Sequence, residues 1–309
     1  MLYYCGERGM WTVLAFISAV CLGCYDISKK VALRENAVVD VLTLSVCVSA
    51  VLLSLPLTLS RLQPEMVAGT PFWVPQLDLQ GHLYTLLKSV IVLSSWIFAY
   101  VSLKHLPISI VSPMQATRPM WTLVGALLLF GERLNAWQWV GVLLAIGTIF
   151  AFSFRNRGEI RREMVDKRYY IFLALAILIG ACSGLYDKYL MRRYDHNAVQ
   201  VYYTLYQAVM MLGVWAVFAA KEKSFHKPIK AIYAIVLISI FLIISDNVYM
   251  LALRDPDSMI AVVSTIRRGG AVIGFAYGFI FLKEPDPKHK ILCMIGICAG
   301  LVCLAIGSV

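Results

Sequence analysis

The stretch MIAVVSTIRRGGAVIGFAYGFIFL, residues 259–282, constrains how the rest of the chain can fold. It is long enough to cross a bilayer as a helix, yet Arg267 and Arg268 stand side by side roughly 12–14 Å inside its start. A charge near the bilayer centre costs about 2.5–3.5 kcal/mol even on insertion scales, so both guanidinium groups must face a protein interior or an aqueous cavity. Gly269 and Gly270 follow, and they allow another backbone or a ligand to approach closely.

Two interpretations of this arginine pair stay open. Intramembrane ionisable groups usually mark substrate pathways, which favours a substrate-facing role for Arg267, Arg268 or both. Alternatively, the two arginines form a fixed pair with an intramembrane acid such as Asp246.

The composition predicts a polytopic membrane protein. Sixty per cent of the residues are hydrophobic and 15% are charged, which excludes an ordinary soluble domain. Ten apolar segments are each long enough to span as a helix, and the alternating pattern of membrane strands is absent. The segments are residues 11–33, 39–60, 83–104, 108–130, 136–154, 169–192, 198–220, 231–253, 259–282 and 289–308.

The first apolar stretch is longer than the core of a signal peptide and ends in charged residues, so we expect no cleavable signal. Cys21 and Cys24 have the spacing of a redox motif but lack its βαβ context, and we interpret them as small apolar packing residues.

The net charge of +10 indicates membrane topology rather than affinity for nucleic acid. By the positive-inside rule, the central link, residues 155–168, is cytoplasmic and both termini lie outside. The basic residues crowd into alternate links: Arg155, Arg157, Arg161, Arg162, Lys167 and Arg168 in the central one, Lys221, Lys223, Lys227 and Lys230 in the seventh, and Lys283, Lys288 and Lys290 in the ninth.

The chain contains an internal repeat. Residues 21–26 and 36–38 match residues 182–187 and 197–199 at a constant offset of 161, with uncommon residue types such as the Tyr-Asp pair among the identities. Further on, Ser95 matches Ser245, and Val111-Ser112 matches Val263-Ser264. The repeat divides the chain into halves at 1–154 and 169–309, joined by the charged linker 155–168.

Five spans in each half is an odd number, so the second half enters the membrane from the opposite side. We therefore predict an all-α membrane protein with ten transmembrane helices as two inverted five-helix repeats, an organisation common in alternating-access transporters. The repeated Tyr25-Asp26 and Tyr186-Asp187 pairs fall near opposite membrane faces, where they are candidates for gates or coupling groups. Alternatively, Asp26 forms a local contact with Lys30, four residues on.

The fourth span, counterpart of the ninth, also contains an arginine. Pro119 follows Arg118 and opens the backbone hydrogen bonding, and Trp121 lies on the same helical face as Arg118. An arginine beside an indole suits an anionic or π-bearing ligand.

Other polar and aromatic groups fall inside spans. Trp96 and Tyr206 are further candidates to line a cavity, because each places a polar tip deep in an apolar segment. Asp246 can neutralise an arginine or carry a coupling proton. Lys88 lies near the end of its span, where its ammonium group can extend to the membrane surface.

Each half closes with an acidic turn and a glycine-containing last span. The turns are Gly131-Glu132-Arg133-Leu134 and Lys283-Glu284-Pro285, and neither is expected to bind a ligand. This arrangement resembles the EamA-type branch of the drug/metabolite transporter superfamily. The resemblance implies a basket of ten helices with a central cavity, peripheral fifth and tenth spans, and secondary transport without an ATP-binding domain. Arg267-Arg268 is also similar to the adjacent Lys-Arg pair in the ninth span of the superfamily's phosphate translocators.

These observations predict a secondary transporter, either an exporter or an exchanger, of a small anionic or zwitterionic metabolite such as an amino acid. Sugar-phosphate or nucleotide-sugar exchange is the alternative, and a non-transporting scaffold or sensor is the alternative from another class. We expect no enzymatic activity and no cofactor, because the five histidines lie at span ends or in loops. The expected partners are the substrate, membrane lipid and a proton, in a monomer or homodimer within a bacterial inner membrane.

Overall fold

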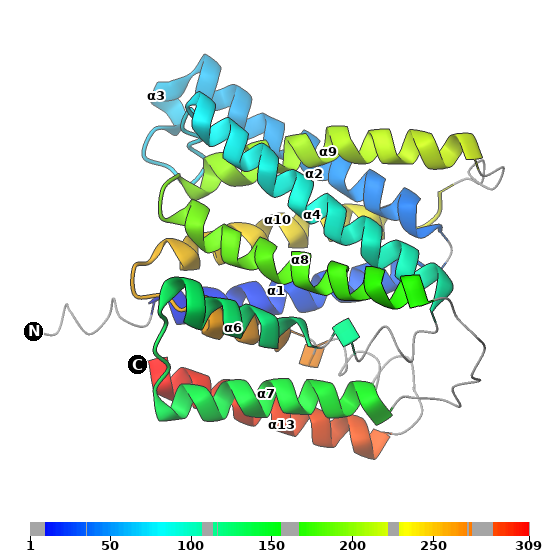
Figure 1. Ribbon diagram of the computed structural model, residues 1–309. Helices are drawn as coiled ribbons and strands as arrows, with labels where there is room; N and C mark the ends of the chain where they lie inside the picture. The colour runs from blue at the N-terminus through cyan, green and yellow to red at the C-terminus, as the bar shows by residue number, and fades with distance from the viewer. Residues whose placement is uncertain are drawn as a thin grey trace, which may run out of the picture.

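The computed structural model describes residues 10–34, 36–106, 114–115, 117–155, 167–221, 229–270, 272–273 and 287–308, and its regular structure there is helical throughout (Figure 1). Within these ranges there are eleven helices. They are α1 (Met10–Ala32), α2 (Val38–Leu62), α3 (Pro64–Val67), α4 (Leu79–His105), α6 (Arg118–Phe130), α7 (Ala136–Arg155), α8 (Lys167–Met191), α9 (His196–Lys221), α10 (Ile232–Arg254), α11 (Ile260–Arg268) and α13 (Pro287–Ser308).

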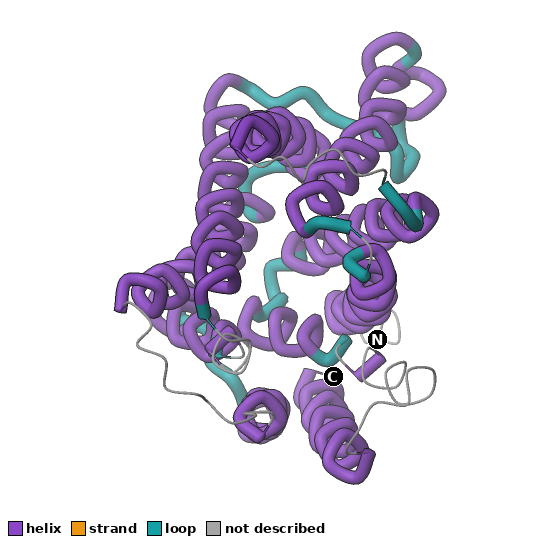
Figure 2. Tube along the Cα trace, turned by 90° about the vertical axis from the view of Figure 1, so that its right-hand side faces the viewer, coloured by secondary structure: helices purple, strands orange, loops and turns teal. Residues whose placement is uncertain are grey.

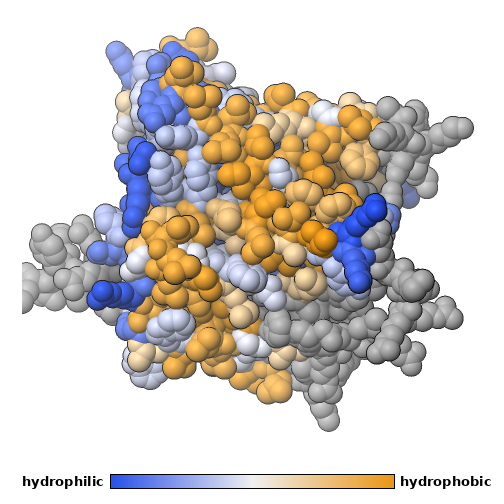
Figure 3. All heavy atoms as spheres, viewed as in Figure 1, coloured by the Kyte–Doolittle hydropathy of each residue, from blue (hydrophilic) through white to orange (hydrophobic). Residues whose placement is uncertain are grey.

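Six of these helices, α1, α2, α4, α8, α9 and α10, are long and apolar enough to cross a membrane, and shorter apolar helices accompany them. Large apolar side chains point outward: Leu128 is 78% exposed and Val209 is 71% exposed. Figure 3 shows such side chains over the middle of one face, with polar ones gathered at its left edge. An exposed apolar surface of this extent is suited to contact with lipid.

Eight of the ten predicted spans occur as continuous helices, but the fourth and the ninth do not. Helix α6 begins only at Arg118, and α11 ends at Arg268. Their 13 and 9 residues give lengths of about 20 and 14 Å, less than the roughly 30 Å of a bilayer core. The expectation of one unbroken helix over 259–282 is therefore wrong. The rest of both predicted spans, and the linker residues 156–166, largely lie outside the described residues.

Local sequence explains both breaks. Pro119 occupies the first turn of α6, where a missing N–H is tolerated and the fixed φ favours a helix start. The helix α11 ends before Gly269 and Gly270, and glycine is a poor helix former. A Cβ atom at Gly270 would overlap the carbonyl oxygen of Ala19 on α1, so the glycine allows the two backbones to touch. The predicted close approach at this glycine is confirmed.

The two halves of the chain pack against each other most extensively through four helix pairs: α1 with α10, α4 with α8, α2 with α9, and α7 with α13. Figure 2, turned by 90°, shows several of these helices nearly end-on. The pair α7 and α13 lies at one side of the bundle (Figure 1), in the peripheral position that the resemblance implies. The other helices surround the interface between the halves.

Hydrogen bonds from buried serine hydroxyls join the two halves at this interface. Ser18 on α1 donates to the carbonyl of Ser245 on α10 at 2.8 Å, and Ser245 donates back to the carbonyl of Ser18 at 3.0 Å. Ser95 on α4 donates to the carbonyl of Ala176 on α8 at 2.8 Å. Such bonds allow helices in an apolar surrounding to approach closely.

The acidic turn between α6 and α7 positions α11. The Glu132 carboxylate accepts hydrogen bonds from the backbone N–H groups of Ile260 at 2.6 Å and Ala261 at 3.2 Å, in the first turn of α11. It also pairs with Lys188 at 3.0 Å, and the two side chains are 5% and 1% exposed. Lys188 in turn donates to the carbonyl of Ser258. Sequence reasoning gave this turn no role; it caps the helix that carries both arginines.

Replacing Glu132 by alanine should destabilise the protein strongly, because it leaves the Lys188 ammonium buried without its partner and removes the cap of α11. We expect a loss of about 3–5 kcal/mol, measured by thermal unfolding in detergent. Glu132→Leu combined with Lys188→Met should recover part of the loss, and Arg133→Ala, at the neighbouring position, serves as the control. A Glu132→Ala variant that melts with the wild type would contradict this role.

Candidate functional site

A cavity of about 260 Å³ lies at the interface of the two halves, bounded by α1, α4, α6, α8, α10 and α11. We call it the charged cavity, because five charged side chains line it: Arg118, Asp187, Asp246, Arg267 and Arg268. A larger cavity of about 620 Å³ lies between α2, α9 and α10, but no ionisable residue lines it. Specific recognition of a polar solute requires convergent polar groups, so the charged cavity is the candidate site.

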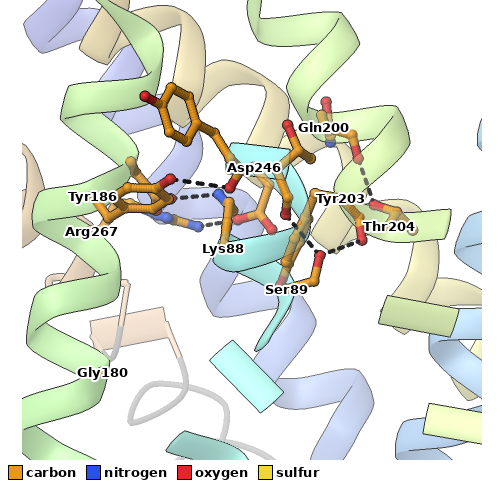
Figure 4. Close-up of polar contacts among 12 residues, drawn as sticks. Lys88, Ser89, Gly180, Tyr186, Gln200, Tyr203, Thr204, Asp246 and Arg267 are labelled. Carbon is orange, nitrogen blue, oxygen red and sulfur yellow. Dashed lines mark hydrogen bonds and ion pairs between the residues drawn. The ribbon is translucent and has the colours of Figure 1, made fainter. Parts of the chain in front are cut away.

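Arg267 is neutralised within the protein. Its Nη2 atom lies 2.6 Å from Oδ1 of Asp246 on α10 and 3.2 Å from the hydroxyl of Ser245 (Figure 4). The guanidinium carbon also lies 4.1 Å from the centre of the Tyr249 ring. The side chains of the ion pair are 16% and 25% exposed. Of the two interpretations of the arginine pair, the fixed pairing with Asp246 therefore holds for Arg267.

Arg268 differs from its neighbour. It lines the charged cavity, is exposed there, and makes no hydrogen bond or ion pair with any residue that the structure describes. Asp26 is near enough to interact with Arg268 electrostatically, although it does not line the cavity. Both arginines occupy the last turn of α11, where the negative end of the helix dipole favours a cation.

Arg118 enters the cavity from the start of α6. Its Nη2 atom donates to the carbonyl oxygen of Gly180 on α8 at 2.5 Å. A Cβ atom at Gly180 would lie 2.6 Å from Cζ of Arg118, so a side chain at this position would displace the guanidinium. The partner is a neutral carbonyl, which accepts a hydrogen bond but does not cancel the positive charge.

A second ion pair joins the two halves beside the cavity. Lys88 on α4 lies 2.5 Å from Oδ1 of Asp187 on α8, and the Lys88 side chain is only 3% exposed. Its ammonium also lies 4.6 Å from the centre of the Tyr203 ring (Figure 4). The expectation that Lys88 extends to the membrane surface is therefore wrong, because an acid on the neighbouring half holds it inside. The sequence offered one indication of this ion pair, namely that two predicted spans contain side chains of opposite charge, Lys88 and Asp187.

The described charges in and beside the cavity do not balance. Arg118, Arg267, Arg268 and Lys88 face Asp187 and Asp246, and Asp26 also interacts with Arg268, which leaves an excess of one positive charge. In an interior of low dielectric, such an excess attracts anions strongly. Across the described part of the chain, no group of His, Cys, Asp and Glu side chains is placed to hold a metal ion.

The structure brings together most of the residues that the sequence singled out. Tyr25, Trp96, Arg118, Asp187, Asp246, Arg267 and Arg268 all line the charged cavity. Four others do not line it. Trp121 is 48% exposed, Asp26 is also exposed, Tyr186 donates to the carbonyl of Tyr84 at 3.1 Å, and the Tyr206 hydroxyl lies 2.8 Å from Nδ1 of His82.

The helical bundle, its apolar exterior and its charged interior define a multi-pass membrane protein with a buried polar site. The family model of the EamA-like transporter family matches residues 9–154, so this part of the chain is an EamA-like transporter domain. No curated protein matches the chain. A solved structure described only as "Crystal structure of protein" is 12% identical, covers 95% of each chain and has a TM-score of 0.74. That likeness shows the fold alone.

The two adjacent arginines should respond differently to neutralisation. Arg267→Gln leaves Asp246 without its ion pair and should lower stability by about 1–3 kcal/mol. Arg268→Gln breaks no described contact and should unfold within about 0.5 kcal/mol of the wild type, as ordinary exposed substitutions do. Thermal unfolding of the two purified variants measures the difference. Equal losses in both variants would show that Arg268 has a structural partner.

Proposed function

We propose that this transporter carries a small anionic or zwitterionic metabolite, as a secondary transporter that works by alternating access. The observation that carries the proposal is the guanidinium of Arg268, which lines the charged cavity and makes no hydrogen bond or ion pair with any described residue. Arg118 is its partner in binding, since its own hydrogen bond goes to a neutral carbonyl. Arg267 is held by its ion pair with Asp246, and so it stabilises one side of the site rather than binding the charge of the substrate.

Physical chemistry supports an anionic group on the substrate. A cation kept in a membrane interior without a counterion is costly, and a protein retains one where it has a functional role. A guanidinium group presents paired N–H donors that match a carboxylate or a phosphate. Tyr25 and Trp96 line the same cavity and suit an apolar or cationic part of a zwitterion. A scaffold or sensor would have no need of the unpaired charge.

The volume of the cavity separates the two transport options. At about 260 Å³ it is below the roughly 300–1,000 Å³ of pockets that hold drug-sized ligands. This size favours an amino acid or a comparable organic anion over a nucleotide sugar. Exchange of a sugar phosphate remains the second candidate, favoured by the two arginines that reach the cavity from different helices.

The pairing of helices supports two inverted five-helix repeats. If α1, α2, α4, α6 and α7 correspond in order to α8, α9, α10, α11 and α13, then exchanging the halves converts the α1–α10 contact into the α8–α4 contact. The α2–α9 and α7–α13 contacts map onto themselves. In Figure 1, α1 begins and α13 ends on the same side of the bundle, which agrees with an even number of crossings.

Equivalent close contacts also support the repeat. Ser95 and Ser245, matched in sequence, each bond the opposite half. The offset of 152 residues between Val111 and Val263 relates Arg118 to Gly270, and the offset of 161 relates Ala19 to Gly180. Arg118 lies against Gly180, and Gly270 lies against Ala19. The two halves thus make equivalent helix contacts. At this contact the first half contributes the long Arg118 side chain, where the second half has Gly270.

Alternating access assigns roles to the remaining polar groups. The ion pair of Lys88 and Asp187 ties α4 to α8, and so rocking of one half against the other would strain it. We assign Tyr25-Asp26 and Tyr186-Asp187 to the two gates, with Asp187 and Asp246 as the candidate proton carriers. The positive-inside count places the central link in the cytoplasm, in an inner membrane of bacterial type.

Ligand-induced stabilisation tests the proposed function. Purified protein would be heated with glutamate, phenylalanine, glucose 6-phosphate, UDP-glucose and, as the uncharged control, glucose. A bound anion at 100 times its dissociation constant should add about 2.7 kcal/mol of stability. Arg268→Gln should remove that stabilisation by weakening binding about a hundredfold, because a charge-assisted contact is lost.

The matched control is Arg193→Gln, which removes an arginine that lies over Tyr189 outside the charged cavity. It should retain the full effect of the ligand. If glucose stabilises the wild type and Arg268→Gln equally while no anion stabilises either, the proposed substrate class is wrong.

A further inference from the structure

A small second cavity of about 80 Å³ adjoins the charged cavity. Tyr25, Trp96, Leu242 and Asp246 line both, so the two spaces share one wall made by α1, α4 and α10. Its far side is formed largely by α9, where Gln207 lies. We call this space the Gln207 chamber. Figure 4 shows its neighbours Gln200, Tyr203 and Thr204 on α9, beside Asp246.

The carboxamide of Gln207 makes no hydrogen bond within the described part of the chain. The residue is 1% exposed, and neither its Nε2 nor its Oε1 atom has a hydrogen-bond partner among the described residues. Buried polar groups in folded proteins are almost always paired, because an unpaired one loses its hydrogen bonds to water without replacement. An unpaired carboxamide that lines a cavity therefore points to a ligand that enters the cavity.

Three other polar side chains that line the chamber, Ser49, Thr204 and Gln200, make hydrogen bonds within the protein. The Ser49 hydroxyl donates to the carbonyl of Ser45 at 2.9 Å, and the Thr204 hydroxyl donates to the carbonyl of Gln200 at 2.9 Å. Gln200 donates to the carbonyl of Ile243 at 2.7 Å and accepts from Asn247 at 2.8 Å. Two glutamines on one helix thus differ: Gln200 is used by the fold, and Gln207 is available.

We propose that the Gln207 chamber is a second subsite of the substrate site and takes an uncharged hydrogen-bonding group of the substrate. Arg268 holds the anionic group in the charged cavity, and the substrate passes the shared wall so that its other end meets Gln207. This inference rests on the proposed function. A carboxamide, carbonyl or hydroxyl group fits the chemistry, since the Gln207 carboxamide both donates and accepts.

The chamber also limits the size of that group. A water molecule occupies about 30 Å³ in the liquid, so a space of about 80 Å³ accepts a few heavy atoms rather than a ring. A site built to bond a polar group discriminates against an analogue that lacks it, because the site's own group is then left unpaired. The chamber would therefore act as the specificity element, and the arginines as the general anchor for an anion.

A matched series of acids tests this subsite. The probes are ω-carbamoyl alkanoates with three to six methylene groups and alkanoates of the same lengths, each measured for binding to the purified protein. The wild type should bind the best carbamoyl acid about tenfold more tightly than its alkanoate, the effect of about one hydrogen-bonded group. Gln207→Met, which keeps the length of the side chain but cannot make these bonds, should reduce the ratio to about one, with alkanoate binding no weaker than in the wild type.

The Ser49→Ala variant is the control, because the hydroxyl that it removes is already bonded within its own helix; it should keep the wild-type ratio. Without ligand, Gln207→Met should melt no lower than the wild type, since it replaces an unpaired polar group by an apolar one. A wild type with no preference at any chain length, a Gln207→Met variant that keeps the preference, or one that melts lower would each overturn the subsite. Failure of the underlying anion site is a separate result, in which Arg268→Gln binds both series as tightly as the wild type.

Discussion

The ion pair between Arg267 and Asp246 determines what the rest of the charged cavity can do. Successive residues on a helix point about 100° apart, so fixing Arg267 toward α10 turns its neighbour in another direction. Arg268 thus lines the cavity without an ion pair to any described carboxylate, although Asp26 interacts with it at longer range. Arg267 is thus part of the structural wall of the cavity, whereas the charge of Arg268 remains available to bind a solute. The two alternatives that the sequence left open are both realised, one by each residue.

The remaining buried charges hold α11 and the two halves in place. Glu132 and Lys188 secure the start of α11, and Gly270 lets its far end rest against α1. Lys88 and Asp187 tie α4 to α8 across the interface. Because these groups are occupied with one another, the excess of positive charge is concentrated at Arg118 and Arg268. The structure thus separates charges that stabilise it from charges that remain for a solute.

Much of this arrangement is visible in the sequence. Length and hydropathy located the helices, and the depth of Arg118, Arg267 and Arg268 in their spans required an interior or a cavity. The sequence does not show which partner each side chain meets, because that depends on the rotation of each helix and on contacts between distant segments. For this reason Lys88 was misjudged, and the structural role of Glu132 was not foreseen. Gln207 attracted no attention, since a single glutamine in an apolar span is distinguished only by the absence of a partner.

Trp121 was predicted to line the cavity from its spacing to Arg118 along the helix, but spacing alone does not decide which side chain enters a cavity. Three residues from Arg118 it shares roughly one face of α6, yet it is 48% exposed, while the longer Arg118 side chain reaches across to Gly180 on α8. Side-chain length, and not position on the helix alone, decides which of the two enters the cavity.

The account depends most on Arg268 being a free cation that binds an anion, and an experimental structure with iodide tests this directly. The anomalous signal of iodide locates the bound ion whatever the natural substrate is. The account predicts an iodide peak in the charged cavity at ion-pair distance from the Arg268 guanidinium, lost in crystals of Arg268→Gln. A cavity without iodide, in which Arg268 is paired with a carboxylate such as Asp26, would contradict it.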